Sequence, residues 1–349
     1  MRFAPALALA GAAAVVATAA YGHAPAQGVP RSFHPQTGAA VGKRDVWILG
    51  WYRRGAAQRL ALVRSTDAGK KFVRVGLPPL SLQGETASLT FVNAHLGYLV
   101  SPRGRLYVTH DGGTNWRPFG PKGVREVAMG GGEIYVLSKN RFERSPLGRS
   151  AWQAVSLPVR YRFLVSLAAR GNKVWLLGST RHIRAGDITL RSSDRGTTFK
   201  KSHAPCFPEL EGMLVPAGDG VVWAVCPSGM MAGLSLSTNG GRTFPRFRSF
   251  HDPGGINLPA LTNGAGIFPT AARAAVLYRG VSGPLFRTTD KGKRWSEIPR
   301  TGRLEQLFWL RFATSRVGLG LFTARSHPNQ ASLWRTTDGG ATWHAMPIR

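Results

Sequence analysis

The sequence predicts an all-β fold made of seven similar units, and three observations lead to this prediction. A motif of the form Ser/Thr-x-Asp-x-Gly-x-x-aromatic recurs along the 349-residue chain. An alternating or apolar run precedes each copy and a short strand-like stretch begins at its aromatic residue, which is the pattern of a β-hairpin. The copies recur about every 45–50 residues, enough for about four short strands per unit. We therefore predict a seven-bladed β-propeller of four-stranded antiparallel blades over residues 30–349.

The motif has the residues of a tight turn. Its acidic or amide oxygen can accept hydrogen bonds from backbone N–H groups of its own turn, and the Gly two positions later supplies a positive φ without steric cost. The closing Trp or Phe can anchor the turn to a neighbouring layer. The central residues of the six intact copies are Asp67, Asp111, Asp194, Asn239, Asp290 and Asp338.

A seventh copy is expected in the one double step of the repeat, between Asp111 and Asp194. The segment Ser145–Trp152 keeps the outer Ser and Trp of the motif but lacks its Asp and its Gly in frame. We interpret it as a degenerate copy, which brings the number of blades to seven.

Each blade is expected to contain strands A to D, with A innermost and the motif at the C–D turn. In blade two we predict strands at about 88–92, 96–100, 106–108 and 115–119, and in blade seven at about 308–312, 317–322 and 332–335, with the last strand at Trp343. Residues from about Ser32 to Val41 are expected to supply the first A strand. In antiparallel blades the A–B and C–D turns share one face of the ring, and the B–C and D–A connections share the other.

The N-terminal residues are typical of a secretory signal peptide, which we assign to residues 1–26. Arg2 is followed by an uncharged run from Phe3 to Ala20 and then by small residues, with cleavage expected after Ala19, Ala20 or Ala26. The alternative is an uncleaved anchor, because the run is just long enough to span a bilayer. We expect a secreted, periplasmic or cell-envelope protein.

Two cysteines, Cys206 and Cys226, are expected to form a disulfide. The segments between them read as a strand pair around a turn at 217–220, which brings the two cysteines together. No metal and no cofactor are expected, because HxH, CxxC and phosphate-loop patterns are absent from the sequence and its nine histidines are scattered.

The charge is the extreme feature of the composition. The 46 Lys and Arg against 17 Asp and Glu give a net charge of +29. Such an imbalance favours an anionic partner: an anionic polymer, a membrane surface or a protein. The alternative is an Arg-rich genome, or life at low pH, acting on a solvated surface. Nucleic acid is not expected, because the arginines are scattered singly and the chain is expected to be exported. We expect a monomer.

Ligands of propellers commonly bind on the face where the D–A loops converge on the axis, opposite the recurring motif. We predict that basic residues of the connections on this face bind the partner. They are Arg53, Arg54, Arg103, Arg105, Arg141, Arg160, Arg162, Arg181, Arg184, Arg300, Arg303 and Arg325.

The recurring motif resembles the Asp-box (BNR) repeats of sialidases, of some glycan-cleaving propellers and of the photosystem II assembly-factor propellers. In all these families the box is a structural turn remote from the functional site. The resemblance to the assembly factors implies an exported seven-bladed propeller without catalytic residues and with an arginine-rich surface.

Resemblance to sialidases implies instead three arginines that grip a carboxylate, a Tyr–Glu pair and an Asp acid/base. Retaining glycosidases in general need two nearby carboxylates. The acidic residues best placed for this are Asp187, Glu209, Asp252 and Glu305. Sialidase-type propellers have six blades, and their Arg-Ile-Pro signature does not follow the N-terminal segment here. We therefore assign no catalytic residue. The leading hypothesis is a non-enzymatic binding or assembly scaffold, and the alternative is a glycoside hydrolase.

Overall fold

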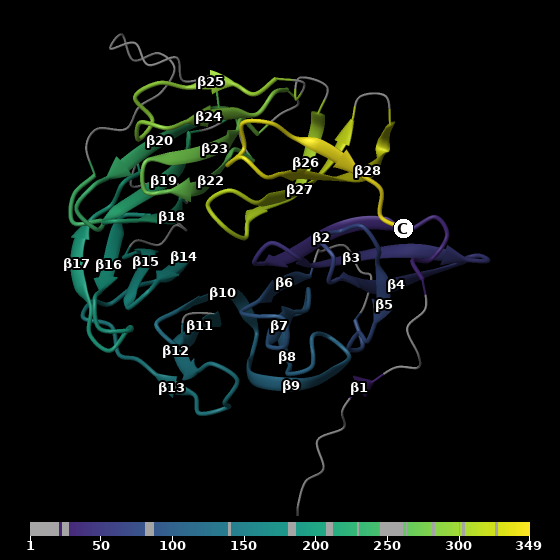
Figure 1. Ribbon diagram of the computed structural model, residues 1–349. Helices are drawn as coiled ribbons and strands as arrows, with labels where there is room; N and C mark the ends of the chain where they lie inside the picture. Colours follow the sequence, from purple (N-terminus) through teal and green to yellow (C-terminus); the bar gives the residue numbers. More distant parts are fainter. Residues whose placement is uncertain are drawn as a thin grey trace, which may run out of the picture.

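The chain forms seven antiparallel sheets arranged as blades around a central axis (Figure 1). The structure is a computed structural model, and it describes residues 21–22, 28–80, 87–138, 141–180, 186–206, 212–228, 230–244, 261–262, 264–280, 283–299, 301, 304–324 and 327–349. Within every blade the strands pair in chain order, so the first strand is innermost and the last is outermost. The predicted all-β, seven-bladed propeller is confirmed.

The strands of the first four blades follow the predicted order A to D. Blade 1 contains β2 (His34–Val41), β3 (Asp45–Arg54), β4 (Ala57–Ser65) and β5 (Val73–Val75); blade 2 contains β6 (Ser88–Phe91), β7 (Gly97–Val100), β8 (Arg105–Thr109) and β9 (Asn115–Lys122); blade 3 contains β10 (Val124–Gly130), β11 (Glu133–Ser138), β12 (Arg141–Pro146) and β13 (Gln153–Ala154); blade 4 contains β14 (Phe163–Arg170), β15 (Lys173–Ser179), β16 (Ile188–Ser192) and β17 (Lys200–His203).

The last three blades are built in the same way. Blade 5 contains β18 (Met213–Gly218), β19 (Val221–Ser228), β20 (Met231–Ser237) and β21 (Leu261–Thr262); blade 6 contains β22 (Gly266–Ala271), β23 (Ala274–Tyr278), β24 (Phe286–Thr288) and β25 (Ser296–Glu297); blade 7 contains β26 (Leu304–Phe312), β27 (Gly318–Ala324), β28 (His327–Thr336) and β29 (His344–Met346). The strand β1 (Tyr21–Gly22) adds a fifth strand to the outer edge of β9 in blade 2.

The Asp boxes are C–D turns, as predicted, and the last one shows how they are built. Thr336 Oγ1 donates a hydrogen bond to Asp338 Oδ1 at 2.8 Å and accepts one from the N–H of Gly340 at 3.0 Å. The N–H groups of Ala341 and Thr342 donate to Asp338 Oδ1 at 2.9 and 3.0 Å, and the Thr342 hydroxyl donates to Oδ2 at 2.6 Å. Partial burial acts to raise the pKa of Asp338, but these hydrogen bonds outweigh it and hold the pKa at about 2.

One backbone hydrogen bond recurs in all seven blades and fixes which turns share a face. In each blade an N–H group of the C–D turn donates to a carbonyl of the A–B turn, at 2.7–2.9 Å. The pairs are Ala68 to Arg44, Gly112 to His95, Leu147 to Gly132, Arg195 to Asn172, Gly240 to Gly220, Lys291 to Arg273 and Gly339 to Arg316. The degenerate copy in blade 3 makes this bond although it lacks the Asp. We call the face with these turns the box face and the opposite face, which holds the B–C and D–A connections, the loop face.

Seven buried apolar clusters fill the seven interfaces between neighbouring blades, one cluster for each interface. Strand B of one blade also contacts the box of the next. The indole N–H of Trp47 donates to the Gly112 carbonyl at 2.9 Å, and that of Trp175 donates to the Gly240 carbonyl at 2.9 Å. A box is therefore a contact between blades as well as a turn within one.

The ring closes without a shared blade, because β2–β5 all come from the start of the propeller and β26–β29 all come from its end. Blades 1 and 7 meet in one apolar cluster, and the N–H of Phe72 donates to the carbonyl of Arg349 at 2.9 Å. Arg311 on β26 donates to Thr90 Oγ1 on β6 at 3.1 Å and so ties blade 7 to blade 2. The side chain of Arg311 is exposed to water, but it lies near the axis with protein around it. This surrounding protein reduces the hydration of the guanidinium and lowers its pKa.

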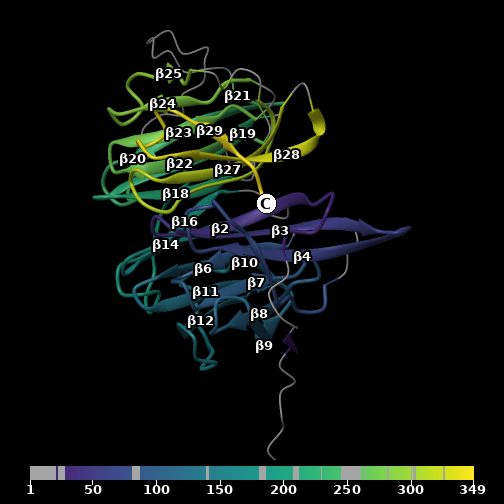
Figure 2. The ribbon, with the colours of Figure 1, turned by 45° about the vertical axis from the view of Figure 1, so that its right-hand side comes forward.

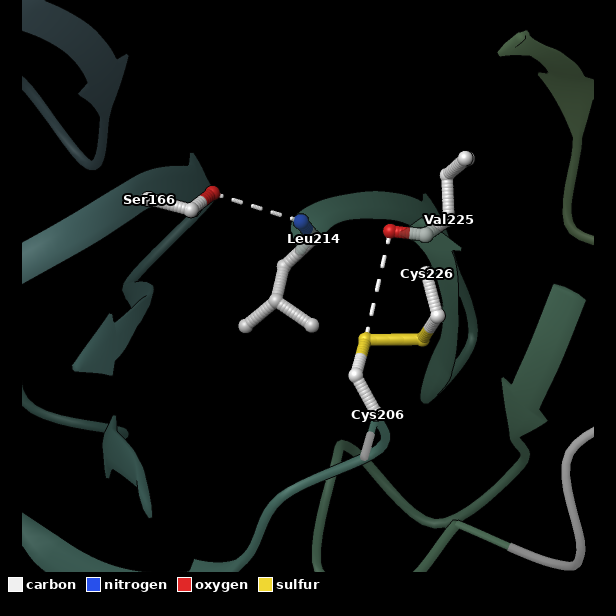
Figure 3. The surroundings of a disulfide bond; sticks show 5 residues. All are labelled: Ser166, Cys206, Leu214, Val225 and Cys226. Atoms are coloured by element: carbon white, nitrogen blue, oxygen red, sulfur yellow. Dashed lines mark hydrogen bonds between the residues drawn. A yellow bond between two sulfur atoms is a disulfide. The ribbon is translucent and has the colours of Figure 1, made fainter. Parts of the chain in front are cut away.

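The predicted disulfide joins Cys206 and Cys226, whose Cα atoms lie 5.2 Å apart (Figure 3). It lies in the interface between blades 4 and 5. The predicted strand pair is present as β18 and β19, with Met213 opposite Val225. Gly212 is required here, since a Cβ atom would lie 2.5 Å from the Cys206 sulfur.

Candidate functional site

The loop face carries every predicted binding arginine that the structure describes. Each of these side chains is exposed and lies on a B–C or D–A connection or at a strand end beside one; they are Arg53, Arg54, Arg103, Arg105, Arg141, Arg160 and Arg162. Arg181, Arg184, Arg300, Arg303 and Arg325 lie outside the described residues. The structure thus brings seven cationic side chains to one face, and their role in binding stays a prediction.

Two of these arginines stand away from the axis. The hairpin of β3 and β4 protrudes beyond the other blades (Figures 1 and 2), and Arg53 and Arg54 are at its tip, opposite Gln58 and Ala57. Arg53 and Arg54 lie there because β3, at 10 residues, is longer than the second strand of every other blade.

Carboxylates are sparse among the described connections of the loop face. These described connections contain one acidic residue, Asp187. Its carboxylate accepts hydrogen bonds from the N–H and the hydroxyl of Thr180, each at 2.9 Å. It closes the B–C connection of blade 4. On the box face, in contrast, cations lie beside box carboxylates, as Arg294 does at 3.4 Å from Asp290. The positive charge of the loop face is thus less offset than that of the box face.

Two carboxylates lie on described innermost strands, on blades 3 and 7. Glu126 accepts the N–H of Leu167 at 2.6 Å and so links β10 to β14. Glu305 on β26 has a buried Oε2 without a hydrogen-bond partner. Of the other acidic residues considered for glycosidase chemistry, Glu209 and Asp252 lie outside the described residues.

The sequence reasoning missed three exposed apolar side chains, two at the loop face and one on an innermost strand. Met213, Met230 and Phe308 are the large hydrophobic residues that are exposed within the described residues, at 43%, 84% and 41%. Met213 begins β18 at the loop face, Met230 lies in the B–C turn between β19 and β20, and Phe308 lies in the middle of the innermost strand β26. Sequence signals for them were weak. Met213 and Phe308 sit in apolar runs that read as buried strand, and Met230 follows a Pro-Ser-Gly turn sequence.

A half-buried aromatic pair lies at the loop-face end of β2. The rings of His34 and Trp51 stack with centroids 4.0 Å apart and an interplanar angle of 10°. Nearby, the guanidinium of Arg74 lies over the ring of Tyr52, 5.5 Å from its centroid. These contacts stiffen the root of the protruding hairpin.

A groove of about 480 Å³ lies elsewhere, on the outer side of the ring between blades 6 and 7. Its lining includes Arg287, Asp290, Arg294 and Glu297, so its charge is mixed. In the part of the chain that the structure describes, no group of His, Cys, Asp and Glu side chains could hold a metal ion. Within the same ranges, no helix has the length and the apolar surface needed to cross a bilayer.

No protein-family model matches the chain, and no curated protein matches its sequence. Solved structures do match it. Ycf48 bound to a D1 peptide has 17% sequence identity and a TM-score of 0.55, over 86% of this chain and 94% of that one. Ycf48 from Cyanidioschyzon merolae has 14% identity and a TM-score of 0.57, over 90% of this chain and 98% of that one.

A GH74 xyloglucanase from Xanthomonas campestris has 15% identity over 89% of this chain and 66% of that one, but its TM-score of 0.34 is too low to support an argument. The resemblance to photosystem II assembly-factor propellers that the boxes indicate is confirmed as a likeness of fold. The chain has the seven-bladed propeller fold of Ycf48.

Proposed function

We propose that this chain is an exported, non-enzymatic propeller that binds a protein partner through its loop face and serves as an assembly scaffold. The observation that supports this proposal is the distribution of charge: seven exposed arginines lie on the described part of one face, where Asp187 is the acidic residue within the described connections. The Ycf48 structure that holds a D1 peptide supports a protein ligand for a propeller of this fold.

The charge of the loop face indicates which kind of partner can bind there. A single exposed arginine contributes little to affinity, because water screens it. Several cations on one face raise the local concentration of an anionic partner and speed its association, and they disfavour cationic partners. We therefore expect an acidic protein segment, and we expect its binding to weaken as salt is added.

A charge-reversal pair of variants tests the proposal. R105E/R141E/R160E/R162E reverses four loop-face cations of blades 2 to 4, and K43E/K200E/K201E/K293E makes the same change of net charge at exposed positions on the box face and the outer strands. Binding of a fluorescently labelled, Asp- and Glu-rich peptide is measured by anisotropy at low and physiological ionic strength.

The loop-face variant is expected to lose salt-sensitive binding, and the control is expected to keep most of it. Equal losses in both variants would show that net charge, and not this face, is responsible. If the unsubstituted protein binds heparin or anionic vesicles but no acidic peptide, the partner is a polymer or a membrane and the proposal is wrong.

A further inference from the structure

The exposed apolar side chains and the described arginines of the loop face belong to different blades, and the predicted Arg300, Arg303 and Arg325 lie outside the described residues. Met213, Met230 and Phe308 belong to blades 5 and 7, which flank blade 6. The innermost strand of blade 6, β22, adds half-buried Phe268 and Pro269 beside them. The seven described arginines belong to blades 1 to 3 and to the connection from blade 3 to blade 4. In Figure 1, blades 5 to 7 lie across the central axis from blades 2 and 3.

An exposed hydrophobic residue on its own needs no explanation, since much of any protein surface is apolar. Two at the loop face and one on an innermost strand, in a molecule whose loop face also carries a set of arginines, are informative. Protein-binding surfaces combine an apolar centre with a polar rim, and Met, aromatic residues and Arg are enriched in them. Methionine adapts its shape to the side chains it meets.

The backbone that presents Met213 is held rigidly. The neighbouring Leu214 N–H donates to Ser166 Oγ of blade 4 at 3.3 Å, and the Cys206–Cys226 disulfide lies directly behind the start of β18 (Figure 3). The carbonyl of Val225, opposite Met213 in the register, lies 3.9 Å from the Cys206 sulfur. A surface that is ordered before binding loses less entropy when a partner arrives.

We propose that an extended acidic segment of a partner protein lies across the axis of the loop face, with bulky apolar side chains on Met213 and Met230 of blade 5 and on Phe308 beside the axis. Its carboxylates lie on the arginines of blades 2 and 3 and of the connection to blade 4. This inference rests on the proposed function and specifies the chemistry of the partner. The position of Phe308 favours a protein over a membrane. It lies in the middle of a nine-residue innermost strand, so a side chain that enters along the axis can reach it and a flat lipid surface cannot.

Three labelled peptides of equal length test the inference: one acidic with a central Leu-Phe pair, one acidic with Gly-Ser at that place, and one with the Leu-Phe pair and Gln for each acid. The variant M213Q/M230Q/F308Q removes the apolar surface with little change in volume at the methionines. A154Q/A345Q, at exposed positions of outer strands, is the matched control. Because Phe308 is partly packed, M230Q alone serves as a variant whose exposed turn position leaves the fold intact.

The unsubstituted protein is expected to bind the acidic Leu-Phe peptide at least about tenfold more tightly than the Gly-Ser peptide, a larger effect than most single interface residues give. The triple variant should bind the two acidic peptides alike, M230Q should lose about threefold for the Leu-Phe peptide only, and the control should match the unsubstituted protein. If the triple variant and M230Q keep the full preference for Leu-Phe, the inference is wrong while the proposed function stands. If no acidic peptide binds, the proposed function itself is wrong. Binding to anionic phospholipid vesicles that requires the three apolar side chains, without peptide binding, would assign the surface to a membrane instead.

Discussion

The role of the box carboxylate can be tested within this chain, because the central residue is Asp in one box and Asn in the box of the next blade. In blade 4, Asp194 accepts hydrogen bonds from the Ser192 hydroxyl at 2.6 Å and from the Thr198 N–H at 3.0 Å, and the Thr198 hydroxyl donates to its second oxygen at 2.6 Å. In blade 5, Asn239 accepts the matching bonds at 2.9 and 3.0 Å, and its amide donates to the Thr243 hydroxyl at 2.7 Å. The amide thus reverses the bond with the threonine hydroxyl and keeps the bonds from the serine hydroxyl and from the threonine N–H.

We predict that Asp194→Asn costs less than about 1 kcal/mol at neutral pH and that Asp194→Ala costs about 1–2 kcal/mol, the range for losing a capping side chain at an exposed turn. Burial acts to raise the pKa of Asp194, but hydrogen bonds from Ser192 and Thr198 outweigh it and lower the pKa below its usual value of 3.8. Since the folded pKa is lowered, the charged carboxylate stabilises the fold above pH 3.8, and this contribution is lost as the pH falls through the folded pKa.

The measurement is urea unfolding followed by tryptophan fluorescence and by exchange of the Thr198 amide, from neutral pH into the acid range. Amide exchange is included because repeat folds can open one unit at a time. The gap between the unsubstituted protein and Asp194→Asn should narrow as the pH falls, and the gap between Asp194→Asn and Asp194→Ala should persist. Asn239→Asp, the reverse change, should make stability rise more steeply from acid to neutral pH. Equal losses for Asp194→Asn and Asp194→Ala, or a gap that ignores pH, would refute the reasoning.

Three further predictions concern contacts between blades. Replacing Cys206 and Cys226 together by Ala should lower the free energy of unfolding by about 3 kcal/mol, the loop-entropy value for a separation of 20 residues, and mass spectrometry after alkylation without reductant should find no free thiol in the unsubstituted protein. A double-mutant cycle of Arg311→Met and Thr90→Val should give a coupling energy of about 0.5–1.5 kcal/mol, and a value near zero would show that the bond does not help to close the ring. Gly340→Ala should lower the free energy of unfolding by about 3 kcal/mol, because the φ of Gly340 is +86° and the added Cβ would lie 2.4 Å from a buried valine of β23. Thermal unfolding measures this loss, and a variant as stable as the parent would contradict the close approach.

Much of the architecture was predictable, because it depends on interactions between residues that are close in the sequence. The boxes require a hydroxyl, a carboxylate and a Gly at fixed offsets, and each hydrogen bond of the turn at Asp338 joins residues within a few positions of each other. The spacing of the boxes then gives the blade length. The disulfide was also predictable, because a hairpin of known length brings Cys206 and Cys226 together.

The candidate site was only partly predictable, for physical reasons. Innermost strands of a propeller contact blades on both sides, so they read as buried runs, and exposure at the axis depends on the closure of the whole ring. In β26 the register also shifts between Leu304 and Leu307 and again before Trp309, which breaks the alternation that would have marked Phe308 as exposed. The length of β3, which carries Arg53 and Arg54 outward, is not set by the repeat.

The boxes bear on function through the charges that they hold in place. Five of the 17 acidic residues are box aspartates, and the shared hydrogen bond between C–D and A–B turns fixes all five on one face. There they offset nearby cations such as Arg294. Because the fold commits these carboxylates to the box face, the excess of basic over acidic residues, 46 against 17, is less compensated across the ring. The described connections there make no such recurring bond. The same turn that repeats the blade thus separates a structural face from a face available for binding.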